Sequence, residues 1–372
     1  MSQRENVNPR REQDHRKNSR RYQKRAAARR RRNTIFIMEI VLLLILAVVL
    51  FIVSKLSKIE KTKLDMDKIE VNEDISQESR KIMKGYQTIA MFGLDNRSNG
   101  NLSQGRSDVI MLANINNDTK EVKLVSVYRD TYLDTGDGIF QKCNAAYAKG
   151  GPEQAISMLN VNLDLNITDY VTVDFNSIIE CVDLLGGVDM EITDDEASLM
   201  TGYIRELNEL TGNKAENLTQ GGTYTLNGVQ ACAYARIRYG GGDDYRRTER
   251  QRTVLTAMVK KAQQSDLTTV NKLINEVCGD IQTSFSNAEL LALASQVFQY
   301  SIGDTTGFPF TKTTRVLSKK TGDVVIPCDL SDNVKELHIF LYEDSAYTAS
   351  DTVKQNSEKI VSDTGFKSGD GH

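Results

Sequence analysis

The segment RIRYGGGDDYRRTERQR, residues 236–252, carries six arginines and no lysine. A charge run is usually a solvated helix face, and apolar residues at helical spacing do follow from residue 248. A face that serves only solubility would mix Lys with Arg, whereas arginine alone favours bidentate recognition of phosphate or carboxylate. Gly240–Gly242 precede this helix, and a glycine-rich turn into a helix N-terminus suits an anion. The segment therefore predicts an anion-binding site.

Three further polar clusters flank apolar runs that are predicted to be strands. Residues 95–97 (DNR) follow one run, residues 106–108 (RSD) precede the next, and residues 129–130 (RD) follow a third. Ligands usually bind at the ends of strands in α/β sheets. Charged groups at such positions must meet water, each other or a ligand. Purely structural Arg–Asp pairing is the alternative, and Arg97 and Asp130 are its candidates.

The arginines of these clusters outnumber the acidic residues. The arginines are Arg106, Arg129, Arg236, Arg238 and Arg247, and the acids are Asp95, Asp108 and Asp244. This balance indicates a divalent cation beside a polyanion, because carboxylate oxygens suit Mg²⁺, which commonly bridges protein to phosphate. Pyrophosphate is the simplest ligand that needs both.

Spacing within the arginine-rich segment predicts which side chains act together. Arg236 and Arg238 are two residues apart, so they share a face if the segment is extended. Arg247 lies at the start of the following helix, and Gln251 is on the same helix face four residues later. The other two arginines of this helix are expected on the surface or in ion pairs: Arg250 and Arg252.

Apolar runs and helical patterns alternate along the chain, which predicts an α/β domain with a mixed central sheet flanked by helices. Strands are expected at 86–93, on either side of a turn at 116–118, and at 169–175, 188–192 and 324–327. Helices are expected at 151–163, at 176–185 with Asn176 as the N-cap, from 248, and at 266–278, 286–300 and 332–342. The polar segment 194–222 is expected to be a loop or lid.

The distribution of charge predicts a membrane anchor. Residues 1–33 contain thirteen Lys or Arg and three acids, and residues 34–53 form an apolar stretch with a single charge, Glu39. A predominantly apolar stretch of twenty residues matches one membrane-spanning helix, and the basic flank should remain in the cytoplasm. The predicted organisation is then a cytoplasmic tail at 1–33, a signal anchor at 34–53, an extracytoplasmic stalk at 54–84, a catalytic domain with a C-terminal helical extension at 85–342, and a polar disordered tail at 343–372.

Several function classes are disfavoured. The three histidines are His15, His338 and His372, so a Ser-His-Asp or Cys-His mechanism is not expected. Five cysteines without a metal-binding spacing allow at most two disulfides. The basic tail lies beside a membrane span, which favours contact with anionic lipid and excludes nucleic acid as the expected partner.

Together the clusters resemble the LytR-CpsA-Psr family of cell-wall phosphotransferases. The matching segments are GLDNR (93–97), GRSDVIML (105–112), SVYRDT (126–131), CNAAYAKGGPEQA (143–155), DYVTVDF, LLGGVDMEI (184–192), LNGVQACAYARIR (226–238) and RRTERQR (246–252). They occur in the family's order over residues 86 to about 263. This chain departs from the pattern at Tyr128, where proline is common, at Arg246, and in the glycine loop Gly240–Gly242.

The resemblance implies an extracytoplasmic enzyme that moves a glycopolymer from an undecaprenyl-pyrophosphate carrier to peptidoglycan, usually to the C6 hydroxyl of N-acetylmuramic acid. Teichoic acid, capsule polysaccharide or another polysaccharide would be the polymer. By the same resemblance, Asp95 and Asp108 would ligate Mg²⁺, with Mn²⁺ as an alternative, while Arg106 and Asp244 would serve the transfer. The pyrophosphate-binding residues would be Arg129, Arg236, Arg238, Arg247 and Gln251.

Two alternatives use the same residues. A pyrophosphatase would employ water as the nucleophile and release free polymer. A non-catalytic regulator that binds lipid pyrophosphate would need the arginines but not the two aspartates, so the presence of Asp95 and Asp108 argues against it.

Overall fold

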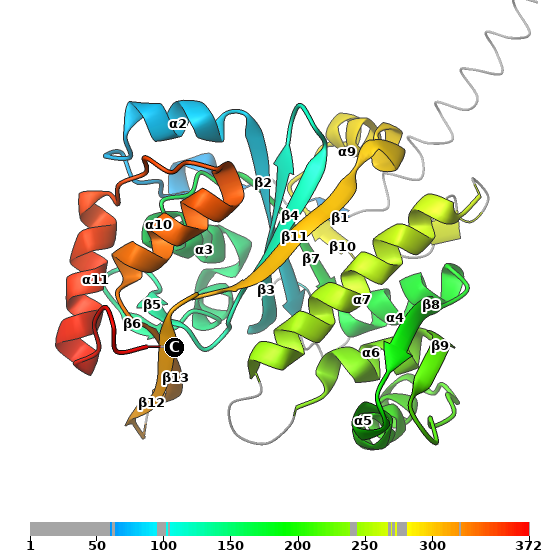
Figure 1. Ribbon diagram of the computed structural model, residues 1–372. Helices are drawn as coiled ribbons and strands as arrows, with labels where there is room; N and C mark the ends of the chain where they lie inside the picture. Colours follow the sequence, from blue (N-terminus) through cyan, green and yellow to red (C-terminus); the bar gives the residue numbers. More distant parts are fainter. Residues whose placement is uncertain are drawn as a thin grey trace, which may run out of the picture. The chain divides into compact units, whose positions relative to one another are not determined.

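A seven-stranded mixed sheet forms the centre of the fold, with the strand order β1-β10-β7-β2-β3-β4-β11 (Figure 1). Its strands are β1 (Glu60–Lys61), β2 (Tyr86–Leu94), β3 (Ser107–Asn116), β4 (Glu121–Val127), β7 (Asp169–Asp174), β10 (Ile281–Thr283) and β11 (Ser301–Phe308). The computed structural model describes residues 60–61, 64–94, 102, 105–238, 244–266, 269, 272–273, 281–319 and 321–371. The predicted mixed α/β class is confirmed.

The pairing of four central strands brings the strand ends next to the predicted site residues to one edge of the sheet. β2 pairs with β7 in parallel, whereas β3 is antiparallel to both β2 and β4. The carboxyl ends of β2, β4 and β7 therefore lie at the same edge as the amino end of β3. The predicted strand–turn–strand of residues 108–131 is present as the β3–β4 hairpin.

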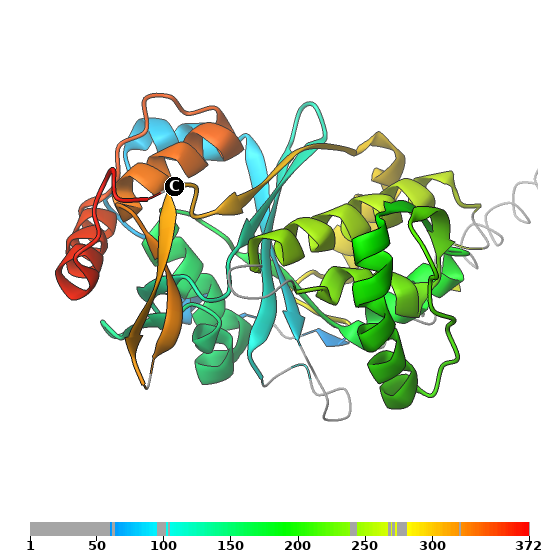
Figure 2. The same ribbon diagram turned by 60° about the horizontal axis from the view of Figure 1, so that its bottom comes forward.

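Successive side chains along a strand point to opposite faces of the sheet, so the apolar core is divided between the two faces. Phe92 and Leu112 enter a large cluster with helices α3 (Ala145–Leu163), α10 (Leu330–Tyr342) and α11 (Asp351–Thr364). Met111 and Leu124 belong to a second cluster on the other face. Figures 1 and 2 show α3, α10 and α11 on one side of the sheet and α7 (Asp244–Gln264) on the other.

A second layer, mainly helical, lies beside α7 and forms an apolar cluster together with it. It consists of α4 (Phe175–Leu184), β8 (Val188–Ile192), α5 (Asp194–Thr211), β9 (Gly222–Leu226) and α6 (Gly228–Arg236). The remaining elements are η1 (Met66–Lys68), α2 (Gln77–Met83), β5 (Tyr132–Asp134), β6 (Phe140–Lys142), α9 (Asn287–Ser295), η3 (Val297–Gln299), β12 (Lys312–Ser318) and β13 (Gly322–Pro327). Gly228 is required where α6 meets α4, because a Cβ there would lie 2.1 Å from the Ile179 carbonyl oxygen.

The predicted stalk and the predicted disordered tail are both wrong where the structure describes them. Ile69, Ile75 and Met83, within 64–84, are buried in the large cluster. The tail forms α11, whose Val353 and Ile360 are fully buried. These two segments also meet through Asp164, which accepts hydrogen bonds from Asn72 and from the Ser350 amide. Both segments are polar overall, and their few apolar residues are at helical spacing only in α11, where Val353 and Ile360 are seven residues apart.

The segment 194–222 is not a loop or lid as predicted, because it contains α5 and β9. Thr193 and Glu196 form a capping box, a signal that is visible in the sequence TDDE. The N-cap of α4 is Asp174 and not Asn176. The helix predicted at 151–163 is the second part of α3, after a kink at Gly150 and Gly151.

Some predictions fall outside the described residues. They include the signal anchor at 34–53, most of the helix at 266–278, and Cys278. Within the described part, no helix is long and apolar enough to cross a membrane. The four described cysteines, Cys143, Cys181, Cys232 and Cys328, form no disulfide with one another.

Candidate functional site

The predicted site residues on the sheet meet at the common strand edge. Asp108 is the second residue of β3, and Arg129 follows the end of β4 by two residues. The Arg129 Nη1 donates to Asp108 Oδ1 at 2.5 Å. Leu94, the last described residue before Asp95, pairs with Ser107 across the β2–β3 ladder. Asp95 itself lies outside the described residues.

Helices α6 and α7 bring the remaining arginines to this edge. Arg236 ends α6, Arg238 follows two residues later, and Arg247 and Gln251 lie on consecutive turns of α7. A pocket of about 310 Å³, here called the arginine pocket, gathers them. Its lining residues are Asp108, Arg129, Phe175, Tyr203, Arg236, Arg238, Arg247 and Gln251. The five predicted pyrophosphate-binding residues are thus together in space, although Arg236 lies at a helix end and not in an extended segment.

Asp244 is surrounded by three of these arginines. Its Oδ1 lies 2.7 Å from Arg247 Nη2, 3.8 Å from Arg129 Nε and 3.9 Å from Arg238 Nη2. Burial raises the pKa of Asp244, and the neighbouring guanidinium groups reduce but do not cancel that rise. The carboxylate is therefore held beside the pocket as a group that can take up a proton more readily than an ordinary aspartate.

Several polar atoms of the pocket are buried without a hydrogen bond to any residue that the structure describes. They are Nε of Arg129, Nε of Arg247, Oε1 of Gln251 and Oδ2 of Asp244. Buried donors normally have partners, and an unsatisfied guanidinium is costly. Burial acts to lower the pKa of Arg129, but Asp108, Asp244 and Asp130 together raise it, so this arginine stays charged. Four arginines line the pocket, and two of them, Arg129 and Arg247, have unsatisfied donors, an arrangement that suits a ligand rich in anionic oxygens.

Arg236 is fixed from three sides. Its guanidinium carbon lies 5.3 Å from the centre of the Phe175 ring and 5.7 Å from that of Tyr203. Its Nη2 donates to Glu206 Oε1 at 3.1 Å. Two aromatic faces and a carboxylate restrict the orientation of this arginine before any ligand binds. Phe175, Tyr203 and Glu206 are not among the site residues predicted from the sequence. Tyr203 and Glu206 lie on α5, in the segment expected to be a loop, and Phe175 is the first residue of α4.

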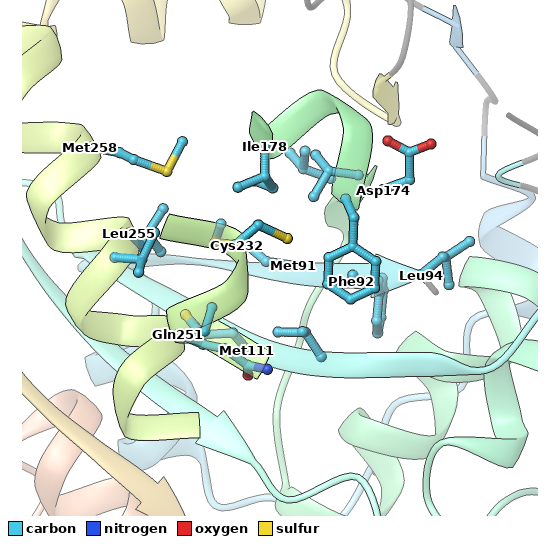
Figure 3. A pocket seen from close by; sticks show the side chains of 17 residues that line it. Met91, Phe92, Leu94, Met111, Asp174, Ile178, Cys232, Gln251, Leu255 and Met258 are labelled. Carbon is cyan, nitrogen blue, oxygen red and sulfur yellow. The ribbon is translucent and has the colours of Figure 1, made fainter. Parts of the chain in front are cut away.

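A narrow apolar cavity of about 120 Å³ adjoins the arginine pocket, and the two share Phe175 and Gln251. The cavity lies between the sheet and helices α4, α6 and α7. Figure 3 shows side chains from all of these elements around it, among them Met91, Ile178, Cys232 and Leu255. Asp174 and Gln251 are its two residues with polar side-chain groups, and Asp174 is engaged in capping α4 through the Ser177 amide.

The other predicted residues have different surroundings. Arg106 is exposed and does not line the arginine pocket. Asp130 lies 3.1 Å from Lys142, which agrees with a structural role. Arg250 pairs with Glu196 at 3.1 Å. Arg252 is neither a surface residue nor paired, because it is 8% exposed and makes no hydrogen bond or ion pair within the described residues.

A magnesium site at this edge would rest on Asp108 and on Asp95. Among the described residues no group of three His, Cys, Asp or Glu side chains could hold a metal ion. Mg²⁺ is often held by one or two carboxylates together with substrate phosphates. Asp108 is partly exposed at the pocket and uses Oδ1 for Arg129, so the residues present fit a cation that is shared with a bound phosphate.

Sequence comparison finds relatives of this chain that match about half of its length. Curated relatives include the polyisoprenyl-teichoic acid–peptidoglycan teichoic acid transferase TagU of Enterococcus faecalis, which is 30% identical over 210 residues, 56% of this chain and 64% of the relative. TagV of Bacillus subtilis is 30% identical over 195 residues, 51% of this chain and 48% of the relative. The chain thus spans about half to two thirds of the length of these relatives.

Solved structures share the fold. The structure of TagT bound to LI-WTA has a TM-score of 0.58 and 21% identity, and the match covers 76% of this chain and 98% of that chain. Protein gbs0355 of Streptococcus agalactiae also has a TM-score of 0.58, with 24% identity over 76% of this chain and 94% of that chain.

The model of the family described as LytR_cpsA_psr matches residues 46–315, a range that contains all the residues of the arginine pocket and the apolar cavity. This range is well over half of the 372 residues, and the chain therefore belongs to the LytR_cpsA_psr family.

Proposed function

We propose that this protein transfers a glycopolymer from a polyprenyl-pyrophosphate carrier to a hydroxyl group of peptidoglycan, with the C6 hydroxyl of N-acetylmuramic acid as the acceptor. The observation that carries the proposal is the junction of the arginine pocket with the apolar cavity at Phe175 and Gln251. A ligand that fills both must have a strongly anionic group joined directly to a hydrocarbon chain. A polyprenyl pyrophosphate has this composition, and the relatives TagU and TagV are named as transferases of polyisoprenyl-linked teichoic acid.

The arginines would bind and orient the pyrophosphate. Arg129 and Arg247 have unsatisfied buried donors for its oxygens, while Arg236 is preoriented by Phe175, Tyr203 and Glu206. Phosphoryl transfer depends mainly on alignment and on stabilising negative charge, and arginine supplies both. Gln251, at the junction, would mark the boundary between the phosphates and the lipid.

The proposed reaction is a displacement at the phosphorus that carries the polymer. The acceptor oxygen forms a bond to this phosphorus, the bond to the bridging oxygen breaks, and polyprenyl phosphate leaves. The hydroxyl proton goes to a carboxylate, for which Asp244 is suited because burial raises its pKa. The product is a phosphodiester between polymer and peptidoglycan. Arg106, which is exposed and directly precedes β3, would assist.

A divalent cation, Mg²⁺ or Mn²⁺, is part of the proposal. Asp108 and Asp95 would hold it, and it would supply further neutralisation of the phosphate charge when bound. The proposal also includes a cell-membrane location with the N-terminus in the cytoplasm, on the basis of the basic tail and the apolar segment 34–53. An anchored domain would remain close to a lipid-linked donor.

The test is a transfer assay with a defined lipid-pyrophosphate glycan and isolated peptidoglycan. We expect polymer to become covalently attached to peptidoglycan, and Arg247→Ala to reduce donor affinity about ten- to a hundredfold, because one charge-assisted contact contributes roughly 1.5–3 kcal/mol. Lys335→Gln on the exposed face of α10 is a matched loss of one positive charge away from the site. Free polymer as the sole product would indicate the pyrophosphatase alternative.

A separate experiment tests whether the apolar cavity binds the lipid chain. Ala235 lines the cavity, and Ala235→Phe should fill part of it. We expect this variant to weaken binding of a long polyprenyl pyrophosphate while leaving the binding of inorganic pyrophosphate unchanged. If Ala235→Phe binds the long-chain ligand as tightly as the wild-type protein does, the assignment of the cavity to the lipid is wrong.

A further inference from the structure

A second polar pocket lies along α7, apart from the arginine pocket, and we call it the lateral groove. Its volume is about 420 Å³. It is lined by Asp189 of β8, by residues of α7 and by residues of β11. Figure 1 shows α7 between β8 and β11. The lining residues from α7 are Arg252, Thr253, Thr256, Ala257, Lys260, Lys261 and Gln264, and those from β11 are Ile302, Gly303 and Thr305. It shares no residue with the arginine pocket or the apolar cavity.

Arg252 is the unusual member of this groove. It is 8% exposed, and its Nε and Nη1 are buried without a hydrogen-bond partner among the residues that the structure describes. Burial lowers the pKa of Arg252, and Tyr128 and Glu249 offset this effect in part. A buried guanidinium without a carboxylate partner is costly, so an anion that enters the groove would gain from it.

The other charges of the groove leave a positive balance along α7. Lys261 lies 3.5 Å from Asp189, and the Glu121 carboxylate lies over Gly303 at the β11 side. Arg252, Thr256 and Lys260 are spaced four residues apart and therefore share one face of the helix. At 1.5 Å per residue, Arg252 and Lys260 are separated by about 12 Å along the axis, with a hydroxyl between them. Two cations at this spacing suit a ligand that repeats its negative charge along its length.

We propose that the lateral groove binds a phosphodiester-linked segment of the glycopolymer itself, separately from the pyrophosphate. The idea rests on the proposed function, because the polymer is the group to be transferred. Arg252 and Lys260 contact two phosphates of the same chain, and Thr256 donates to the part of the chain between them. The groove then favours polymers with charged backbones over neutral polysaccharides, whereas the arginine pocket and the apolar cavity recognise the carrier common to both.

The test uses a soluble glycerol-phosphate oligomer, which has phosphodiesters but neither lipid nor pyrophosphate. Binding to the full-length protein is measured as a function of salt for wild type, Arg252→Met, Arg252→Lys and Lys260→Gln. We expect Arg252→Met to lower affinity about tenfold or more, and each loss of charge to reduce the slope of log K against log salt by roughly one. Arg252→Lys should retain the slope, which a merely structural defect would not do.

Lys335→Gln is again the matched control, and polyprenyl pyrophosphate binding is measured for every variant. Loss of oligomer binding with intact lipid-pyrophosphate binding supports the lateral groove. Oligomer binding that is unchanged in Arg252→Met and Lys260→Gln, or equally reduced by Lys335→Gln, overturns it while leaving the proposed function intact. If the variants weaken binding to phosphatidylglycerol vesicles but not to the oligomer, the groove contacts anionic lipid and the proposal is wrong. Failure of Arg247→Ala to affect lipid-pyrophosphate binding would instead count against the proposed function.

Discussion

Asp244 Oδ1 lies 2.7 Å from Arg247 Nη2, one turn away at the start of α7, and the same oxygen also faces Arg129 and Arg238. One carboxylate therefore partly neutralises three of the arginines that line the pocket. The arrangement gives Asp244 two opposing effects on a reaction at this site. As a proton acceptor it would favour transfer, but as a negative charge it opposes the binding of an anionic donor.

We therefore predict that Asp244→Asn separates kcat from donor affinity. Loss of the proton acceptor should reduce kcat by about 10²–10⁴-fold. Donor affinity should stay the same or increase, because the three arginines are released from their carboxylate. Steady-state kinetics and direct binding of a pyrophosphate analogue test the two effects. A parallel loss of affinity and kcat would show that Asp244 only maintains the fold of the pocket.

The pH dependence of transfer gives a second check on Asp244. Because burial raises its pKa above the ordinary aspartate value of 3.8, the ionised form is lost at a higher pH than usual as acid is added. Activity should fall as the pH decreases through that raised pKa. Measurement of kcat/KM against pH should show an acid limb in wild type that is absent from the residual activity of Asp244→Asn. An acid limb that is unchanged in the variant would assign this titration to another group.

Glu206 is predicted to be a positioning residue that acts through Arg236. Its Oε1 accepts from Arg236 Nη2 at 3.1 Å, and this fixes a guanidinium that also lies against Phe175 and Tyr203. Glu206→Ala should weaken donor binding about three- to tenfold, whereas Glu206→Gln should recover most of this loss because it can still accept the hydrogen bond. Glu209→Ala, an exposed acid on the same helix, is the control. Equal effects of Glu206→Ala and Glu209→Ala would remove Glu206 from the site.

The metal proposal predicts that Asp108→Ala abolishes transfer without unfolding the domain. Asp108 lies at a strand end and is partly exposed, so it contributes little to core packing. Circular dichroism and metal titration of the full-length protein should show native structure with weakened Mg²⁺ binding. Full activity of Asp108→Ala, or of wild type in excess chelator, would contradict a role for the cation.

His338 is predicted to make stability depend on pH. It is fully buried, it stacks on Tyr347 with ring centres 3.7 Å apart, and its Nε2 lies 3.1 Å from the Leu163 carbonyl oxygen. Burial lowers the pKa of His338 below 6.5, although Asp164 and Asp344 act to raise it. The unfolded chain therefore binds the proton more readily, so stability is present above about pH 6.5 and is lost as the pH falls through the lower folded pKa.

Urea unfolding between pH 5 and pH 8 tests this prediction. One proton limits the slope of stability against pH to about 1.4 kcal/mol per unit. His338→Gln retains a donor for Leu163 but does not titrate, so its stability should change less over this range. An identical pH profile in the two proteins would assign the dependence to other groups.

The sequence by itself determined which kinds of side chain meet at the candidate site. Arginines without lysine, a glutamine one turn beyond Arg247 and aspartates at strand ends were sufficient to predict an anion pocket, since these signals depend on residue type and local spacing. The strand pattern likewise predicted β2, β3, β4 and β7, because alternation of burial is visible within a few residues. The capping box at Thr193 was also present in the sequence, yet the polar character of 194–222 outweighed it.

Only the tertiary structure decided which residues share a pocket. Arg236 meets Glu206 across thirty residues. Arg252, expected at the surface or in an ion pair, is buried where β11 packs against α7, and its Nε and Nη1 have no hydrogen-bond partner in the described part of the chain. Segments 64–84 and 343–371 proved to be part of the core for a similar reason, since Asn72 and Ser350 both bond to Asp164. Contacts between distant segments depend on how whole elements pack, and local periodicity carries no information about that packing.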